Sequence, residues 1–248
     1  MKRKQLVFDK LRPVAINEAR LEHLATLEPS LNFHNRTVLE VGAGIGQLTY
    51  FWEERGCSVT STDGRSENLL ENLKRHPWRV DSLHLADLRD CHSHSLLGQF
   101  DIVFAYGILY LVPTYQLPDI IAELAAMTKE LFLASMIVQP VDSGTIDQMD
   151  KDNPEVPNSS LDGKRSLVAR DWFLAELRKR FEFAYITRTQ PDDRVFPIKW
   201  STRLKNPRCI FVASRHKLDS KVFSEELLLE QTKAKSWRDY EGQIVRYF

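Results

Sequence analysis

Net charge, long apolar runs and cysteine are all scarce in this sequence. Its 34 Lys and Arg residues balance 34 Asp and Glu residues, so no overall field draws the chain to nucleic acid or to an anionic membrane. No stretch approaches the roughly 18 apolar residues of a spanning helix, and the basic N-terminus lacks the apolar run of a secretory signal. Three scattered cysteines, Cys57, Cys91 and Cys209, argue against a disulfide framework. We therefore expect a cytoplasmic protein with free thiols that binds neither nucleic acid nor membrane.

Strand-like and helix-like patterns alternate along most of the chain. Such alternation is typical of a parallel sheet with crossover helices. The sequence predicts a Rossmann-like, doubly wound α/β fold with a seven-stranded, mostly parallel sheet and a terminal antiparallel strand. The predicted strands are 36–42, 57–63, 80–88, 100–113 with a break at Gly107, 131–138, 181–190 and 208–215, and the helices are 46–56, 66–77, 117–130 and 169–181.

Three regions follow from this alternation. Residues 1–35, with a helix at 16–24, form an N-terminal helical cap, and residues 36–215 form the sheet domain. Within that domain, the apolar residues of 139–169 and 190–207 follow neither a helical nor a strand period. We expect these segments to be loops that cover a substrate. Residues 216–248 are predicted as a helical extension that packs back on the domain or contacts a second copy, or as a linker to a second domain.

Glycine is also rare, with 10 residues in all, yet three of them fall within five positions. Gly42, Gly44 and Gly46 follow the first predicted strand and precede a helix. Such a turn lets the backbone approach a ligand, and the helix N-terminus offers free N–H groups. A dinucleotide fingerprint would carry glycine three places after Gly44, where this chain has Gln47. The turn therefore fits a dinucleotide less well than another nucleoside.

Together with two further motifs, this turn makes the chain resemble the class I S-adenosylmethionine-dependent methyltransferases. The resemblance rests on "EVGAGIG" (40–46), on Asp63 at the end of the second strand and on "ADL" (86–88), and it covers 36–215. It implies S-adenosylmethionine as cofactor. It also implies a cofactor site with these residues: Asn17 and Arg20 from the N-terminal helix, Glu40, Gly42, Ala43, Gly44 and Gly46 from the first motif, Asp63 and Gly64 at the ribose, Asp87 and Leu88 at the adenine, and Tyr106 after the fourth strand.

Several of these residues also have a purely structural interpretation. Asp63 and Asp87 could each serve a turn, and Tyr106 could be a core aromatic. Asn17 and Arg20 lie three apart on a helix and could form a solvated pair. The run "CHSH" (91–94), with His84 nearby, matches none of the usual zinc spacings, so no metal is expected.

A sulfonium methyl group is already activated, so the enzyme must chiefly position a nucleophile and exclude water. We expect Tyr106, Arg165 and Trp200 to act on the substrate, Arg165 as a carboxylate clamp and Trp200 as an apolar surface. Other candidate surface residues come from the two loops: Lys164, Gln190, Asp192 and Asp193.

Two motifs that are absent from the sequence narrow the range of possible substrates. The [DN]-P-P-[YF] motif of methyltransferases acting on adenine or glutamine nitrogen is replaced by "AYGILY" (105–110), and the paired-glutamate loop of protein arginine methyltransferases is absent. The sequence favours a small natural-product-like molecule or a peptide, with carboxylate or hydroxyl oxygen as acceptor. The alternatives are N-methylation, a nicotinamide-dependent oxidoreductase, and a non-catalytic nucleoside-binding module.

Overall fold

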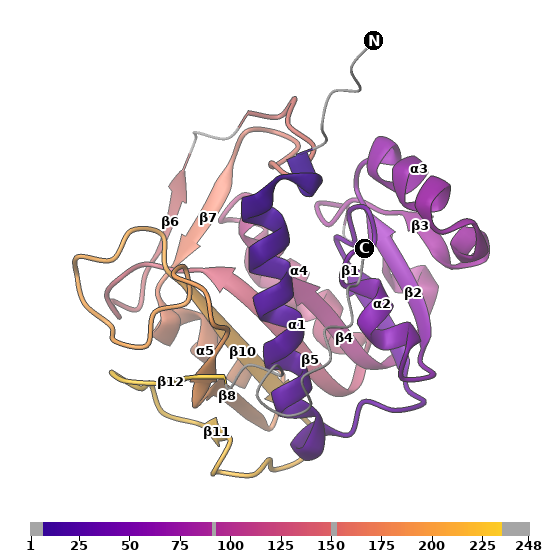
Figure 1. Ribbon diagram of the computed structural model, residues 1–248. Coiled ribbons are helices and arrows are strands. Elements are labelled where there is room, and N and C mark those ends of the chain that lie inside the picture. The colour runs from indigo at the N-terminus through magenta and orange to yellow at the C-terminus, as the bar shows by residue number, and fades with distance from the viewer. Residues whose placement is uncertain (1–6, 91–92, 150–152, 235–248) are drawn as a thin grey trace.

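The computed structural model describes residues 7–90, 93–149 and 153–234, which build a layered α/β structure (Figure 1). Its centre is an eight-stranded sheet in the order β11-β8-β10-β5-β4-β1-β2-β3. The strands from β3 to β5 are parallel to their neighbours, whereas β10 is antiparallel to both β5 and β8. The bounds are β1 (Thr37–Val41), β2 (Ser58–Asp63), β3 (Leu83–Leu85), β4 (Phe100–Tyr106), β5 (Thr128–Ile137), β8 (Phe183–Thr187), β10 (Arg208–Ser214) and β11 (Phe223–Ser224).

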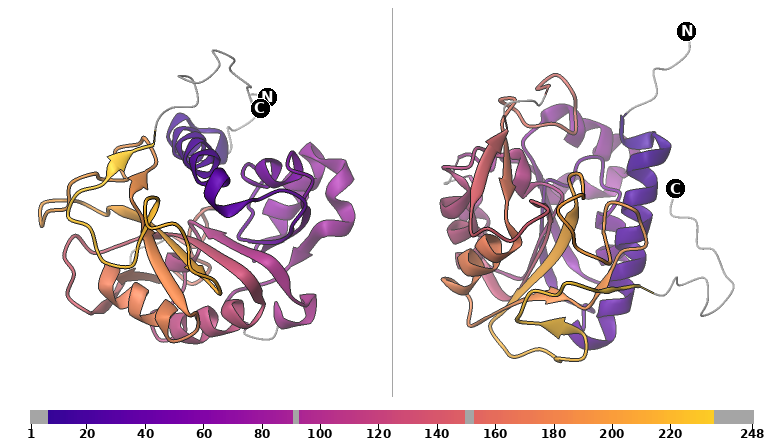
Figure 2. Two further views of the ribbon diagram at one scale, coloured as in Figure 1. Left: turned by 90° about the horizontal axis from the view of Figure 1, so that it is seen from below. Right: turned by 90° about the vertical axis from the view of Figure 1, so that its left-hand side faces the viewer.

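Helices cover both faces of this sheet, as Figure 2 shows. One apolar core lies between the sheet and α1 and α2, and a second lies between the sheet and α4 and α5. The central strands β4 and β5 are almost entirely buried, which explains why their sequences are continuous apolar runs. The helices are α1 (Leu11–Leu31), α2 (Thr49–Glu53), α3 (Ser66–Arg75), α4 (Leu117–Ala126) and α5 (Arg170–Arg178), with short 3-10 turns at Val7–Asp9, Pro77–Ser82, Ser95–Leu97 and Leu109–Leu111.

The predicted fold class is confirmed, but the sheet has eight strands rather than the predicted seven, and the last predicted strand does not lie at its edge. This strand, β10, is the antiparallel one, but it inserts between β5 and β8 rather than lying at the edge. Its first residue, Arg208, therefore pairs with Ile137, at the carboxyl end of β5. An antiparallel strand thus brings its amino end to the edge where the parallel strands end.

The predicted loop at 139–169 contains regular structure. Two strands, β6 (Ile146–Met149) and β7 (Arg165–Val168), pair antiparallel. Alternate residues of β7, Ser166 and Val168, are buried, and Val168 also bridges to Val138 just beyond β5. The segment is ordered by this contact with the sheet domain, which no local periodicity reveals.

The prediction of a helical C-terminal extension is wrong for the part of it that the structure describes. Residues 216–234 contain β11 and β12 (Thr232–Lys233) and no helix. β12 pairs in parallel with β9 (Thr189–Gln190), and the buried Gln231 side chain accepts a hydrogen bond from Gln190. These backbone and side-chain partners hold the chain extended. Residues 235–248 lie outside the described residues.

Within the described ranges, none of the helices is long and apolar enough to cross a membrane.

Candidate active site

A pocket opens at the carboxyl ends of β1, β2 and β4, and residues from the N-terminal half of α1 also line it. Segment 157–161, which lies between β6 and β7, covers its far side. The structure thus brings together residues from distant parts of the sequence. The predicted cofactor residues that line the pocket are Asn17, Arg20, Glu40, Gly42, Ala43, Gly44, Asp63, Gly64, Asp87, Leu88 and Tyr106.

The glycine turn between β1 and α2 is shaped by positive φ angles and by close neighbours. Gly42 and Gly44 have φ of 73° and 57°, which L side chains rarely adopt. A Cβ on Gly42 would also lie 2.5 Å from Cγ1 of Ile108. Gly46 is different, because it does not line the pocket and instead packs on Arg79, whose Nη1 would lie 2.1 Å from an added Cβ. The turn leaves bare backbone against the pocket at its first two glycines.

Gln47 follows this turn where a dinucleotide fingerprint would carry glycine. Its Oε1 accepts a hydrogen bond of 2.8 Å from Asn17 on α1, and its Nε2 donates to the backbone oxygen of Phe8 at 3.2 Å. Gln47 therefore ties the N-terminal segment over the turn. Phe8 itself lines the pocket, although no local sequence pattern singles it out.

Asp63 ends β2 with its carboxylate buried and directed at the turn. Oδ2 accepts from the Gly44 N–H at 2.9 Å, while Oδ1 accepts from the Arg65 N–H at 2.9 Å and from Asn68 Nδ2 at 3.1 Å. Burial raises the pKa of Asp63 above its usual value. A carboxylate has about four acceptor positions, so one position on Oδ2 is left for a further donor.

Glu40 lies one layer deeper, inside β1. It is 2% exposed and accepts hydrogen bonds from Thr49 Oγ1 at 2.5 Å and from Ser61 Oγ at 3.3 Å. Burial raises its pKa to about 7. Glu40 therefore links the strand to the first turn of α2 from beneath the glycine turn.

Asp87 follows β3 at the outer rim of the pocket. Its carboxylate forms a forked pair with Arg89, with Nη2 to Oδ2 at 2.6 Å and Nε to Oδ1 at 3.1 Å. Although burial alone would raise the pKa of Asp87, the hydrogen bonds from Arg89 hold it below its usual value. Arg89 also lines the pocket.

The covering segment is held by α3 and the residue before it. Arg65 Nη2 donates to the backbone oxygen of Pro154 at 2.7 Å, and Asn68 Nδ2 donates to that of Pro157 at 3.2 Å. Leu161 closes over Gly64, with its Cδ1 3.0 Å from the position of an added Cβ. Part of the predicted covering loop 139–169 thus lies over the ends of β2 and β3.

The opposite end of the pocket, between α1, β4 and β10, is cationic. Arg20 is only 5% exposed and donates to Asn17 Oδ1 at 3.0 Å and to Ser135 Oγ at 3.3 Å, and its Nε has no hydrogen-bond partner among the described residues. Arg208 donates to the hydroxyl of Tyr110 at 3.3 Å. Within the same part of the chain, the hydroxyl of Tyr106, buried beside Arg20, has no hydrogen-bond partner either.

Tyr110 lies among these positive charges. Although burial raises the pKa of a phenol, the charges of Arg208, Arg20 and Arg165 lower the pKa of Tyr110 overall. The guanidinium carbons of Arg208 and Arg165 lie 5.4 and 6.0 Å from the centroid of the Tyr110 ring. Tyr110 and Arg208 both line the pocket, and the sequence prediction of the site did not include Arg208.

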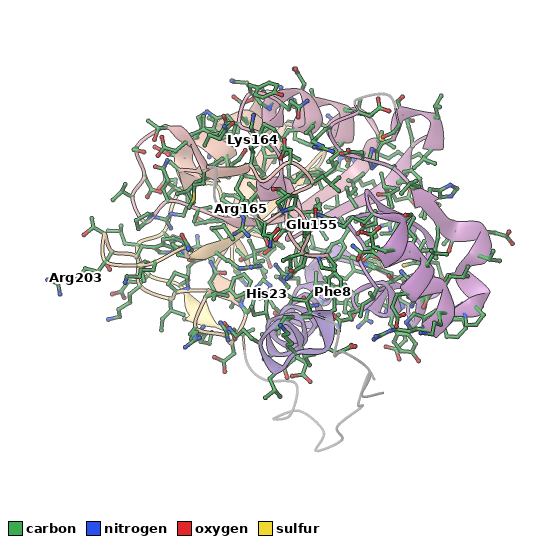
Figure 3. All side chains as sticks on the ribbon, turned by 90° about the horizontal axis from the view of Figure 1, so that it is seen from above. Phe8, His23, Glu155, Lys164, Arg165 and Arg203 are labelled. Carbon is green, nitrogen blue, oxygen red and sulfur yellow. The ribbon has the colours of Figure 1, made fainter. Side chains whose placement is uncertain are left out.

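Two of the three residues predicted to act on the substrate do not line the pocket. Arg165 lies near its rim beside Tyr110, close to the middle of the view in Figure 3. Trp200 is engaged elsewhere, since it stacks on Arg170 at 3.8 Å and donates to Gln231 at 2.8 Å. The predicted covering loop 190–207 packs on the C-terminal segment through the Lys199–Glu230 bridge, and Arg203 extends from it at the periphery in Figure 3.

His94, from the run after β3, is not among the residues that line the pocket. His94 is buried, with Nε2 3.2 Å from Thr62 Oγ1. In the part of the chain that the structure describes, no group of three or more His, Cys, Asp and Glu side chains is placed to hold a metal ion. Cys91 and His92 lie outside that part. Cys57 and Cys209 are free thiols.

Comparisons with known proteins agree with this geometry. Residues 38–130 match the methyltransferase domain family, whereas no curated protein matches the chain. Among solved structures, the N-terminal domain of EvdMO1 with S-adenosylhomocysteine bound is similar, with 18% identity, a TM-score of 0.62 and 80% of each chain covered. Magnesium protoporphyrin IX methyltransferase from Synechocystis PCC 6803 (17%, 0.56, 82% of this chain and 84% of that one) and the glycopeptide N-methyltransferase MtfA (16%, 0.50, 79% and 89%) are similar as well.

The strand order, the inserted antiparallel strand and the glycine turn define the class I methyltransferase fold. The match over 38–130 covers β1 to the start of β5, which includes the turn, Asp63 and Asp87. Residues 38–130 thus match a methyltransferase domain, and the described structure has the fold of the class I S-adenosylmethionine-dependent methyltransferases.

Proposed function

We propose that this enzyme methylates an oxygen atom, of a carboxylate or a hydroxyl group, on a small natural-product-like molecule or a peptide. The proposal combines the chemistry of the class with the side chains at the two ends of the pocket. The substrates named for two neighbours, a glycopeptide and a magnesium porphyrin, are of these two kinds. Neither neighbour identifies the acceptor atom of this enzyme.

The wall between the glycine turn and Asp63 suits the cofactor. The bare backbone of Gly42 and Gly44 accommodates a ligand in close contact, and the remaining acceptor position of Asp63 Oδ2 fits a ribose hydroxyl. Leu88 and Asp87 would flank the adenine, with Ala43 and Gly64 along the same wall. Arg20, buried without an acidic partner, would hold the methionine carboxylate with help from Asn17.

When bound, S-adenosylmethionine supplies a sulfonium methyl group, so that an acceptor lone pair forms the new bond as the C–S bond breaks and a neutral thioether leaves. The chain then has to position the acceptor and exclude water. Phe8, α1 and segment 157–161 enclose the pocket and serve the second task. The hydroxyl of Tyr106, which has no hydrogen-bond partner among the described residues, would position the substrate by donating a hydrogen bond to the atom that receives the methyl group.

The observation that carries the choice of oxygen is the composition of the cationic end. Its polar side chains are those of Arg20, Arg208, Tyr106 and Tyr110, and histidine is absent from the described residues that line the pocket. The lining carboxylates, Glu40, Asp63 and Asp87, all belong to the opposite wall. A protonated amine would need a base, whereas a carboxylate needs none and a hydroxyl could use Tyr110, whose pKa is lowered.

The proposal is tested by methyl transfer from S-adenosylmethionine to matched acceptors that differ in a single group: carboxylic acid, alcohol or phenol, and amine. Mass spectrometry detects the added methyl group, and alkaline hydrolysis separates a methyl ester from an ether or an amine. We expect products on oxygen, with turnover reduced about tenfold or more in Tyr106→Phe, which removes one hydrogen bond. Products on nitrogen alone would overturn the proposal.

A further inference from the structure

The cationic end of the pocket contains more positive charge than the cofactor can neutralise. In the described parts of the chain, no carboxylate lies within 4.0 Å of the guanidinium group of Arg20 or of Arg208. Each arginine keeps its charge under ordinary conditions, and Arg20 is almost fully buried. Buried charges in proteins are generally paired, so Arg20 points to an anion that a ligand supplies, and the partly buried Arg208 presents a second guanidinium group to the same pocket.

The two arginines reach the pocket from different elements and contact different partners. Arg20 comes from α1 and contacts Ser135 on β5 and Asn17. Arg208 begins β10, opposite Ile137, and contacts the hydroxyl of Tyr110. Burial and the charge of Arg208 together lower the pKa of Arg20 to about 9, so the two cations disfavour one another. One cofactor carboxylate, held by Arg20, leaves Arg208 without a counter-charge.

Tyr110 does not remove this need. As a neutral phenol it accepts one hydrogen bond from Arg208 at 3.3 Å, and among the described residues the other donors of the guanidinium group have no acceptor. Tyr110 is also 7% exposed and lines the pocket. Its hydroxyl therefore lies beside Arg208 as a second hydrogen-bonding group for the same ligand.

We propose that the methyl acceptor binds as an anion, through a carboxylate or phosphate group held by Arg208 together with the hydroxyl of Tyr110. This inference rests on the proposed function, because it takes Arg20 to hold the cofactor. It adds a substrate subsite and the charge of the substrate. A guanidinium group binds both oxyanions through two parallel hydrogen bonds.

The experiment uses the full chain saturated with S-adenosylhomocysteine and three small probes: benzoate, phenyl phosphate and the neutral benzamide. Ligand-observed NMR in low-salt buffer gives the dissociation constant of each. We expect at least one anion to bind about tenfold or more tightly than benzamide, since charged hydrogen bonds are the stronger ones. The relative affinity of benzoate and phenyl phosphate identifies which oxyanion the subsite prefers.

Two variants test the assignment to Arg208. In Arg208→Gln, the anion should bind about tenfold more weakly, while the affinity for S-adenosylhomocysteine changes less than about twofold. Arg203→Gln, which removes the same charge at the periphery of the molecule (Figure 3), is the matched control and should leave both affinities unchanged. The cofactor measurement also shows whether Arg208→Gln remains folded.

Three results would overturn the inference: equal binding of anions and benzamide, unchanged anion binding in Arg208→Gln, or anion binding that S-adenosylhomocysteine displaces. The last result would assign Arg208 to the cofactor carboxylate. Failure of the wild-type chain to bind S-adenosylhomocysteine at all would instead contradict the proposed function, which keeps the two failures distinct.

Discussion

At the scale of single residues, Asp63 joins the glycine turn to the proposed ribose site. Its carboxylate already accepts hydrogen bonds from Gly44, Arg65 and Asn68. We expect Asp63→Ala to weaken S-adenosylhomocysteine binding by about 1.5–3 kcal/mol, because it removes a charged acceptor and releases the turn. Isothermal titration calorimetry measures this change. Asp119→Ala, on the exposed side of α4, is the control and should bind as wild type does; an unchanged affinity in Asp63→Ala would exclude it from the site.

Glu40 predicts a pH dependence of stability in the ligand-free protein. Burial raises the pKa of Glu40 from its ordinary value of 4.5 to about 7, so the folded state binds more protons than the unfolded state between these pH values. Stability therefore falls as pH rises through this window, by up to about 3 kcal/mol from this group. Glu40→Gln keeps an acceptor for Thr49 but does not titrate.

Urea unfolding at pH 5 and pH 7.5 measures this contribution. The free energy of unfolding of Glu40→Gln relative to wild type should rise between the two pH values, since only wild type loses stability from this group. The comparison cancels the histidines, which titrate in both proteins. A constant difference between the two proteins would show that Glu40 remains ionised without strain.

The predicted residues that the structure brings together are those with a local sequence signal. Gly42, Gly44, Asp63 and Asp87 were found because short motifs place them at the ends of strands, and all of them line the pocket. Phe8 and Arg208 were missed, because each reaches the pocket only through packing with elements far away in the sequence. Trp200 was singled out for its residue type, and its contacts with Arg170 and Gln231 lie away from the pocket.

At the scale of elements, α1 depends on a buried histidine for its attachment. His23 is fully buried, and its Nε2 lies 3.1 Å from both the backbone oxygen and Oγ1 of Thr189. Burial lowers its pKa to about 4. The unfolded state therefore binds the proton more readily, and the stability that neutral His23 provides is present above about pH 6.5 and is lost as pH falls toward 4.

We expect His23→Gln to reduce this loss on acidification. At pH 5, His23 costs wild type on the order of 2 kcal/mol relative to pH 7.5, since the window spans more than one pKa unit. Thermal unfolding at both pH values provides the measurement. His34→Gln is the control, because His34 is largely exposed and pairs with Glu28. An acid sensitivity of His23→Gln equal to that of wild type would contradict the assignment.

Strands that form only by pairing with residues far away in the sequence were harder to predict than helices, whose apolar residues recur at helical spacing. The helices at 66–77 and 169–181 correspond closely to α3 and α5, because leucines and aromatics recur at helical spacing. In contrast, β9 and β12 are two residues long and exist only through pairing with each other. Leucines at 227–229 imitate a helical pattern, yet Leu229 is 73% exposed and its backbone oxygen accepts from Trp200.

At the scale of the whole molecule, the position of β10 couples fold to site. A sheet of parallel strands alone would present only strand ends and the loops after them at the pocket edge. The inserted antiparallel strand adds the start of a strand, and with it Arg208. The sequence predicted an antiparallel final strand but not its place in the sheet, because strand order depends on which edges are left open by the other elements.

The melting temperature of the whole molecule should also distinguish S-adenosylhomocysteine from NAD, because a ligand that binds the folded state stabilises it. A ligand that binds only the folded state at one hundred times its dissociation constant adds about 2.7 kcal/mol, which raises Tm by about 5–10 °C for a domain of this size. We expect this shift with S-adenosylhomocysteine and none with NAD, because Gln47 stands in place of the third glycine and binds Asn17 and Phe8 across the turn. Differential scanning fluorimetry with both ligands at equal concentration tests this. An equal shift with NAD would favour the oxidoreductase alternative, since a pyrophosphate would then fit the turn despite Gln47.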